Sequence, residues 1–334
     1  MNKIILVFNS VFILLLLFSC AVPYISSEAF SFLSILSLTV PFLVVLNCLF
    51  LIYWLLIGKK QFLWSLSVLI LGYGIHGDFY KIKLSKSEID GKGLQVMSFN
   101  TMSFSKVIPN LEYKITDFVS THSPDIICFQ EFDFKQKRSK NFKEYPYRFI
   151  DFEYGVTSGR VLQAIYSKYP IVHKGIFFIG DIRKNCTIGT FGEIQDTLRV
   201  YNLHLQSLKI RASSLTEEPS AKLFKRVTKS FAKQQQQVGI VTGHMRSTDH
   251  KKIVCGDFNN TQFSNVYYTL KDNMLDTFKE KGSGFGRTYS FARFPGRIDF
   301  ILTDPSFEVL LHKNFDVRLS DHFPVMASIR LKDQ

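Results

Sequence analysis

Charge is almost absent from the first 80 residues of this 334-residue chain. They hold three lysines, one glutamate and one aspartate, so nearly all of the net charge of +13 belongs to the remainder. With 46% hydrophobic and 21% charged residues overall, the chain is neither a disordered nor a low-complexity protein. This uneven distribution argues against a purely cytosolic soluble enzyme. It predicts a membrane part followed by a basic globular part.

Three long uncharged stretches in this first part predict two to three membrane spans. They cover residues 4–22, 30–57 and 61–77. Because a helix needs about 20 apolar residues to cross the hydrocarbon core, the second stretch is long enough even with Pro41, and the third is at the lower limit. Three buried helices of a soluble core are the alternative interpretation.

The only strongly positive loop between these stretches, Lys59-Lys60, is expected to be cytoplasmic. Three spans then place the chain after residue 80 outside the cytoplasm, in an integral protein of a bacterial-type inner membrane. If residues 1–21 were a cleaved signal peptide, the two remaining spans would give the same orientation. If the third stretch only lay on the membrane surface, the globular part would face the cytoplasm.

The globular part lacks cysteines at paired spacings, and it lacks tryptophan altogether. Only Cys128, Cys186 and Cys255 lie outside the membrane stretches, and their spacing excludes a disulfide framework and a zinc site. Cys128 and Cys255 fall within apolar strands and are expected to be buried. Both tryptophans lie before residue 80, so the globular part has none to stack on a nucleobase.

Residues 81–93 are polar and predict a linker, and residues 94–334 predict one domain. Short apolar runs alternate there with helical patterns and polar loops. The predicted strands are 94–100, 125–130, 148–152, 161–166, 187–193, 197–205, 252–256, 297–303 and 325–331, and the predicted helices are 110–121, 219–244 and 265–270. Several runs are apolar on both faces, which is typical of a sheet covered on both sides in a layered α/β sandwich. The basic helix 219–244 is either a solvated surface over an apolar stripe or a surface that attracts phosphate or anionic headgroups.

Polar side chains recur at the ends of these predicted strands. The carboxylates and amides are Asn100, Glu131, Asp257, Asn259, Asp299 and Asp321. Such hard oxygen ligands suit Mg²⁺ or Mn²⁺ rather than zinc. His204 and His322 can contact a phosphate or act as acid or base near neutral pH. Each of these residues, taken singly, has an ordinary structural interpretation: Glu131 could lie in a solvated loop, and Asp299 could only neutralise Arg297. Taken together, the residues predict one site for a metal and a phosphate.

The six motifs SFN, FQE, NLHL, GDFN, RIDFIL and SDHFPV occur in this order between Leu94 and Leu331. In this order they resemble the endonuclease/exonuclease/phosphatase superfamily. The resemblance implies an α+β, DNase I-like fold, a four-layer α/β/β/α sandwich, here preceded by transmembrane helices. It also implies that Glu131 is the main Mg²⁺ ligand, with Mn²⁺ as a possible substitute, that Asn100 lies beside the metal, and that Asp321 supports the metal site.

The same resemblance implies catalytic roles for the remaining site residues. Asp257 would orient and deprotonate the attacking water, and Asn259 would hydrogen-bond the phosphoryl group. His322 would contact the phosphate, held in orientation by Asp299, and His204 would be a second histidine on the phosphate side. The reaction expected is hydrolysis of a phosphodiester or phosphomonoester by direct attack of water.

The substrate is less sharply indicated than the reaction. Tyr166 is a candidate for the tyrosine that DNA-repair members place before the NLHL-type strand, and the basic segment that contains Lys135, Lys137 and Arg138 could bind a polyanion. The basic charge slightly favours a nuclease, and the membrane stretches favour a phospholipid, sphingomyelin or inositol-phosphate hydrolase. A non-catalytic, membrane-tethered binding module is a further alternative. No protein partner is indicated.

Overall fold

The structure is a computed structural model that describes residues 2–77, 79–82, 93–102, 108–132, 142–151, 162–179, 182–192, 197–210, 217–291 and 294–332. The chain forms two compact units. The helical unit consists of Met1–Tyr80, Leu208–Gln236 and Asn260–Leu270, and the sheet unit consists of Lys81–Ser207, Gln237–Asn259 and Lys271–Gln334. Two segments that follow the predicted linker therefore belong with the apolar helices.

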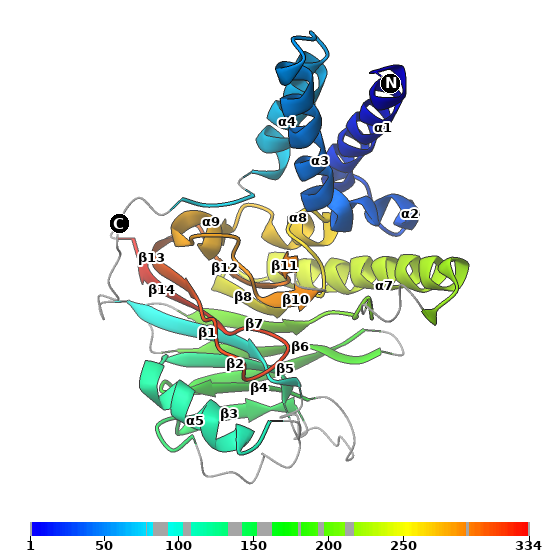
Figure 1. Ribbon diagram of the computed structural model, residues 1–334. Helices are drawn as coiled ribbons and strands as arrows, with labels where there is room; N and C mark the ends of the chain where they lie inside the picture. The colour runs from blue at the N-terminus through cyan, green and yellow to red at the C-terminus, as the bar shows by residue number, and fades with distance from the viewer. Residues whose placement is uncertain are drawn as a thin grey trace. The chain divides into compact units, whose positions relative to one another are not determined.

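The helical unit is built on three apolar helices that run side by side (Figure 1). They are α1 (Asn2–Ala21), α3 (Leu36–Leu56) and α4 (Phe62–His76), with the short η1 (Val22–Tyr24) and α2 (Ser31–Ser34) between the first two. Leu16, Leu43 and Val68 are buried where these helices pack together. By length and composition, Asn2–Tyr24 and Leu36–Leu56 could each cross a membrane. The third predicted span is a helix of 15 residues, α4, which is shorter than the usual span.

The sheet unit contains two six-stranded sheets. The first has the order β13-β14-β1-β2-β4-β3, formed by Phe307–Asn314, Val325–Leu331, Leu94–Asn100, Ile126–Phe132, Leu162–Ser167 and Tyr147–Ile150. The second has the order β5-β6-β7-β8-β12-β9, formed by Ile171–Ile179, Ile182–Phe191, Leu198–His204, Lys251–Asp257, Asp299–Thr303 and Leu275–Asp276. A separate hairpin pairs β10 (Tyr289–Phe291) with β11 (Phe294–Gly296). Both large sheets mix parallel and antiparallel pairs.

The strands are apolar on both faces because the first sheet has a core on each side. Along β1, Val96 joins the core between the sheets, and the next residue, Met97, joins a second core under α5 (Leu111–His122). Ile126 and Ile127 of β2 divide in the same way. Each such side chain contributes about 1.5–3 kcal/mol when fully buried. The alternation that a single buried face would require is therefore absent.

Helices complete the layers on the outer side of the second sheet. The final turns of α7 (Ser220–Arg246) reach β7, where the Tyr201 hydroxyl lies 3.0 Å from Nδ1 of His244. The short α9 (Thr277–Lys281) packs on β12 and β13. The resulting order of helix, sheet, sheet and helix confirms the predicted α+β, four-layer architecture.

Most of the predicted strands are confirmed with shifts of a few residues. The strands β5 and β13, the short strands β9, β10 and β11, and the helix α9 were not predicted. Cys128 and Cys255 are free and buried, as expected. α8 (Asn265–Lys271) occupies the position of the last predicted helix.

Candidate active site

Strand pairing brings three of the predicted site residues into one row. In the parallel pair of β7 and β8, His204 is opposite Asp257, and in the antiparallel pair of β8 and β12, Asp257 is opposite Asp299. Residues that are opposite each other on neighbouring strands have side chains close together. Three motifs that are separated by some 40 to 50 residues in the sequence therefore meet at one end of the second sheet.

Gly256 makes this close approach possible. Its φ is +134°, and a Cβ atom there would lie 2.0 Å from the carbonyl oxygen of Leu203 on the neighbouring strand. No other residue fits this position without moving the backbone. The glycine of the GDFN motif thus sets the spacing between β7 and β8 immediately before Asp257.

The Asp257 carboxylate is the centre of the cluster and is 1% exposed. The side-chain amides of Asn100 and Asn259 each donate to Oδ2 over 3.0 Å, and the backbone N–H of Asn259 donates to Oδ1 over 2.7 Å. Asn259 adopts a left-handed conformation, with φ 50°, and its amide also donates to the carbonyl oxygen of Leu205. Three donors, one from β1 and two from the turn that follows β8, therefore hold the Asp257 carboxylate in one orientation.

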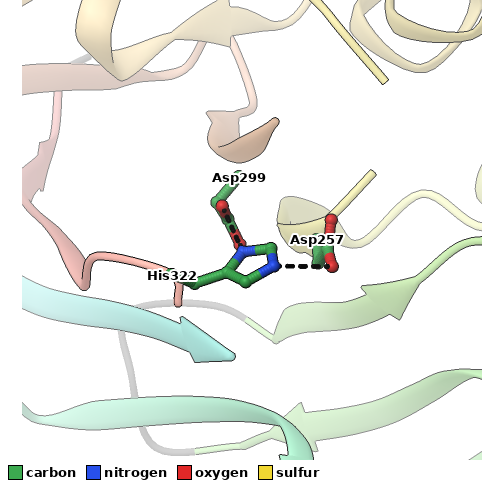
Figure 2. A group of neighbouring side chains, drawn as sticks. All are labelled: Asp257, Asp299 and His322. Carbon is green, nitrogen blue, oxygen red and sulfur yellow. Dashed lines mark hydrogen bonds and ion pairs between the residues drawn. The ribbon is translucent and has the colours of Figure 1, made fainter. Parts of the chain in front are cut away.

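His322 lies between two carboxylates, as Figure 2 shows. Its Nδ1 is 2.9 Å from Oδ2 of Asp299, and its Nε2 is 3.7 Å from Oδ2 of Asp257. One ligand atom from each of these three residues lies within 4.8 Å of the others. Because Asp299 occupies Nδ1, it fixes the orientation of the ring and directs Nε2 towards Asp257.

His204 connects Asp257 to Glu131. Its Nε2 is 3.7 Å from Oδ2 of Asp257 and 3.5 Å from Oε1 of Glu131. The side chain of Asn100 also acts on Glu131, where it opposes the rise in pKa that burial causes. Glu131 and His322 therefore belong to the same cluster, as the predicted site requires.

An irregularity in β2 turns Glu131 towards the second sheet. The register between β2 and β4 shifts between Phe129 and Phe132, and Glu131 has a φ of 49°, in the left-handed region. In a regular strand, consecutive side chains point to opposite faces. Here the side chains of Gln130 and Glu131 both reach β7, where they contact Asn202 and His204. This strained backbone is typical of a functional site.

A buried polar network beside the cluster was not predicted from the sequence. The Gln130 amide donates to Oδ1 of Asn202 over 2.7 Å and to the Ser98 hydroxyl over 3.1 Å. The Asn202 amide in turn donates to the carbonyl oxygens of Phe129 and Ala164. These residues precede Glu131, His204 and Asn100 by one or two positions in their strands, so the network fixes the two sheets where the site residues emerge.

Two further positioning contacts support the C-terminal motifs. The buried Thr288 hydroxyl accepts hydrogen bonds from the backbone N–H groups of Ile298 and Asp299, both over 3.0 Å. Arg297 pairs with Asp276 over 2.8 Å and lies against the rings of Phe278 and Phe300. The described contacts therefore assign Arg297 to Asp276 and Asp299 to His322, which answers the alternative that Asp299 only neutralises Arg297.

Burial and neighbouring charge shift the acid–base properties of these groups in opposite directions. Burial raises the pKa of Asp257 to about 6, and the nearby Asp299 adds to this effect. Burial also raises the pKa of Glu131, and it lowers the pKa of His204. For His322, burial acts to lower the pKa, but the carboxylates of Asp299 and Asp257 outweigh it and raise the pKa to about 10. We therefore expect His322 to be protonated and His204 to be neutral at pH 7 in the metal-free protein.

The remaining predicted residues lie in different surroundings. Asp321 is exposed and accepts a hydrogen bond from the Ser320 hydroxyl, and its charge acts on Glu131 and His322. Tyr166 is 1% exposed among the core aromatic residues Phe129, Phe132 and Phe142. This burial does not favour a contact of Tyr166 with substrate. Lys135, Lys137 and Arg138 lie outside the described residues, so their predicted role in polyanion binding is untested.

Two family models match the chain, and they divide it close to the predicted linker. One, described as the Endonuclease/Exonuclease/phosphatase family, matches residues 97–322. The other, described as Domain of unknown function (DUF8431), matches residues 2–79. No curated protein matches the chain.

Several solved structures share the two-sheet fold. An endonuclease/exonuclease/phosphatase from Bacteroides vulgatus is 20% identical, with a TM-score of 0.55 over 72% of this chain and 100% of its own. TDP2 from D. rerio, complexed with a single strand DNA product, is 15% identical, with a TM-score of 0.53 over 72% and 99%. A mannosyl-6-phosphatase from Bacteroides thetaiotaomicron is 18% identical, with a TM-score of 0.50 over 71% and 100%. At these identities the likeness establishes the fold.

Proposed function

We propose how this chain, which belongs to the endonuclease/exonuclease/phosphatase family, hydrolyses phosphate esters. Water attacks phosphorus directly, in a reaction that depends on Mg²⁺ and takes place at a membrane. The observation that carries this proposal is the Asp257 carboxylate, which two asparagine amides orient and two histidines approach. A buried carboxylate with this many partners is suited to accept a proton from an oriented water.

The donor set beside Asp257 fits a hard divalent cation. Glu131 is a carboxylate whose side chain is 29% exposed, and burial together with the charges of Asp321 and Asp299 raises its pKa. A divalent cation would relieve this concentration of negative charge, and carboxylate and amide oxygens are the ligands that Mg²⁺ prefers. We assign Glu131 as the main ligand, with Asn100 beside it and Asp321 in support. Mn²⁺ has the same ligand preferences and should substitute.

The chain's own residues account for the proton transfers. Asp257 takes a proton from water as the water oxygen bonds to phosphorus, and Asn100 and Asn259 keep its carboxylate aligned. Protonated His322, held by Asp299, donates a hydrogen bond to a phosphoryl oxygen, where negative charge develops. The bond from phosphorus to the leaving alcohol breaks, and the alcohol oxygen takes up a proton. A bound Mg²⁺ supplies further positive charge at the phosphoryl group.

The helical unit supports an integral membrane location. The helix α3 ends at Leu56 and α4 begins at Phe62, so Lys59-Lys60 lies at one end of the apolar helices, together with Lys3 near the start of α1. The positive-inside rule assigns this end to the cytoplasm. We therefore propose that residues 1–80 anchor the protein and that the domain 94–334 is extracytoplasmic.

Hydrolysis of a small soluble ester tests the chemistry without a choice of natural substrate. The full chain in detergent should hydrolyse bis(p-nitrophenyl) phosphate or p-nitrophenyl phosphate with Mg²⁺, and a chelator should abolish the activity. Glu131→Ala and Asp257→Ala should each lose it, whereas Glu308→Gln, which changes a surface carboxylate paired with Arg330, should not. Activity in ¹⁸O-water should place one ¹⁸O atom in the phosphate product. Full activity in either alanine variant would remove the assignment.

A further inference from the structure

The segment 260–270, which follows the GDFN motif, is attached to the apolar helices by three side-chain hydrogen bonds. The amide of Asn265 donates to the carbonyl oxygen of Pro23 over 2.7 Å. The hydroxyl of Thr261 donates to the carbonyl oxygen of Ser37 over 3.1 Å, and that of Tyr268 to the carbonyl oxygen of Ile75 over 2.6 Å. All these residues belong to the helical unit. The three carbonyl groups lie in η1, which follows α1, near the start of α3 and near the end of α4.

Two of these carbonyl groups lack the partner that a regular helix would supply. The Ser37 carbonyl would normally accept from the residue four positions on, which is Pro41, and proline has no N–H. The Ile75 carbonyl lies in the last turn of α4, where carbonyl groups have no donor within the helix. Unpaired carbonyl groups near lipid cost several kcal/mol each. Thr261 and Tyr268 supply the two missing donors, so the attachment is built into the helices themselves.

Apolar and aromatic contacts add to this attachment. The ring of Phe263 packs edge-on against His76 at 5.3 Å, and the ring of Tyr268 lies 6.4 Å from that of Tyr24. Burial raises the pKa of Tyr268 to about 12, so its hydroxyl remains a donor throughout the physiological range.

The attached end of the helices has the composition of a membrane–water interface. The connection from α1 to α3 exposes Tyr24, Phe30 and Phe32, with 72%, 50% and 53% of their surface accessible. Aromatic residues gather at the level of the lipid headgroups. When α1 and α3 span a membrane, the segment 260–270 is therefore held at its surface.

The first half of α7 belongs to the same unit. Val227 and Phe231 are buried there with Ile35 of the connection. Lys222, Lys225 and Lys229 are exposed at spacings that place them on one face of the helix. Basic side chains near a bilayer are attracted to anionic headgroups by about 1 kcal/mol each.

The covalent chain keeps the proposed base close to this surface. Asp257 precedes Thr261 by four residues, and four residues of extended chain span at most about 15 Å. This is about half the thickness of the hydrocarbon core. The distance is an upper limit, because the backbone N–H of Asn259 donates to the Asp257 carboxylate and turns the chain there. Hydrolysis in the bilayer requires a shorter separation, since a lipid raised by the full thickness of a leaflet would leave the bilayer.

We propose that the substrate is a phosphate ester of a membrane lipid, hydrolysed while its acyl chains stay in the bilayer that the apolar helices anchor. This inference rests on the function proposed above and on the membrane anchor. In the reaction, the oxygen of water bonds to the lipid phosphorus, one phosphorus–oxygen ester bond breaks, and the departing alcohol takes up a proton. The segment 260–270 ties the chain that follows Asp257 to the apolar helices and takes no part in the chemistry.

The test compares the same headgroups in and out of a bilayer. The full chain is reconstituted with Mg²⁺ in nanodiscs that contain phosphatidylcholine with phosphatidylethanolamine, phosphatidylglycerol or phosphatidic acid, and the products are identified by mass spectrometry. Parallel reactions contain the dihexanoyl forms of these lipids below their critical micelle concentrations, bis(p-nitrophenyl) phosphate, or plasmid DNA. We expect at least one bilayer lipid to be hydrolysed about tenfold or more faster than its dihexanoyl form, because the anchor concentrates and orients it. DNA should be cleaved more slowly still.

Variants separate positioning from folding. Thr261→Val and Tyr268→Phe each remove one donor to an apolar helix. They should lower turnover of the bilayer lipid about tenfold and leave hydrolysis of bis(p-nitrophenyl) phosphate within about twofold of wild type. Tyr113→Phe, which removes a hydroxyl from an exposed tyrosine of α5, is the matched control and should change neither rate.

Three results would overturn the inference. They are faster cleavage of plasmid DNA than of any bilayer lipid, hydrolysis of bis(p-nitrophenyl) phosphate without hydrolysis of any bilayer lipid, and an equal loss on all substrates in both variants. The proposed function itself fails if the wild-type chain hydrolyses none of these esters with Mg²⁺, or if Asp257→Asn hydrolyses them as wild type does.

Discussion

Each unit of this protein contains a buried polar cluster, and the two clusters differ in kind. In the helical unit, the amide of Asn9 donates to the Ser65 hydroxyl over 2.9 Å and accepts from the indole N–H of Trp54 over 2.9 Å. These groups are neutral and belong to three different helices. In the sheet unit, the buried cluster consists of the ionisable residues Asp257, Asp299 and His322.

This difference separates polar groups that specify packing from groups that carry chemistry. Neutral interhelical hydrogen bonds in apolar surroundings contribute about 0.6 kcal/mol on average, so they can fix the arrangement of α1, α3 and α4 at little risk to stability. Burying charges costs several kcal/mol per ion unless each is well paired. The sheet unit accepts this cost at a site where two carboxylates hold one protonated histidine.

The largest expected effect follows from removing the charge of Asp257. Asp257→Asn keeps the shape of the side chain but not its ability to accept a proton, so kcat for bis(p-nitrophenyl) phosphate should fall by about a thousandfold or more. The thermal unfolding temperature should change by only a few degrees, because the loss of a buried charge offsets the weaker bonds to Asn100, Asn259 and His322. Steady-state kinetics and a thermal melt on the same preparation measure both.

Asp316→Asn changes an exposed carboxylate of the sheet unit and serves as the control. A marked loss of thermal stability in Asp257→Asn, with activity lost only in proportion to unfolding, would mean that Asp257 is structural.

Disrupting the buried network between the sheets should reduce both stability and kcat, with a smaller loss of kcat than in Asp257→Asn. Gln130→Leu leaves Oδ1 of Asn202 buried without its amide donor, which costs about 1–3 kcal/mol of unfolding free energy. Because Glu131 is the next residue, kcat should also fall, by about tenfold. Denaturant unfolding and kinetics measure the two effects.

Gln163→Leu is the matched variant, since Gln163 is buried in the same network and donates to the Asn202 carbonyl but precedes no site residue. It should reduce stability without reducing kcat. Equal losses of kcat in the two variants would contradict a specific positioning role for Gln130.

The pH dependence of stability should come from the sheet unit. Burial lowers the pKa of His312 to about 4, with Arg297 also lowering it and Asp276 opposing. Because the unfolded chain, with its ordinary histidine pKa, binds the proton first as pH falls, the contribution of neutral His312 is complete above about pH 6.5 and is lost towards about pH 4. Lowering the pH from about 8 to about 5 should therefore remove about 2 kcal/mol of the stability that His312 contributes, while the raised pKa values of His322 and Asp257 act in the opposite direction over this interval.

Urea unfolding at these two pH values, followed through the β-sheet signal, measures this loss. Relative to wild type, His312→Asn should lack this loss, so the variant should gain about 2 kcal/mol on wild type between the two pH values. If wild type and variant lose the same stability over this interval, other groups are responsible.

The smallest effect is expected in the helical unit. Asn9→Ala removes the bonds to Ser65 and Trp54 and should cost about 1 kcal/mol or less, measured by thermal loss of the helical signal in detergent. Hydrolysis of a soluble ester should not change. Ser10→Ala is the control, because the Ser10 hydroxyl donates only within its own helix, to the Leu6 carbonyl. A loss of activity in Asn9→Ala alone would show that helix packing acts on the site.

The fold could be predicted from the sequence where the pattern is local. The strand Leu94–Asn100 and the helix α5 have clear apolar periodicity and lie within a residue or two of their predicted bounds. The strand β5 was missed because His173 and Lys174 interrupt its apolar pattern, and as the edge strand of its sheet it can expose them. In β13, the buried His312 obscured the apolar run in the same way.

The site could be predicted because its residues occupy strand ends that topology brings together. Long-range contacts with no local signal could not be predicted. The bond between Gln130 and Asn202 joins two sheets over 72 residues, and the pairing of Arg297 with Asp276 depends on how α9 packs. The positive φ of Glu131 is set by a bulge, which sequence pattern alone does not indicate.

Binding of a divalent ion to the full chain tests the central claim most directly. A titration with Mn²⁺, followed by electron paramagnetic resonance, should show an ion that Mg²⁺ displaces, and Glu131→Gln should abolish this binding while the thermal unfolding temperature of the metal-free protein stays within a few degrees of wild type. Binding that is unchanged in Glu131→Gln, or no binding in the wild-type chain, would contradict the assignment of this cluster as a metal-dependent phosphoesterase site.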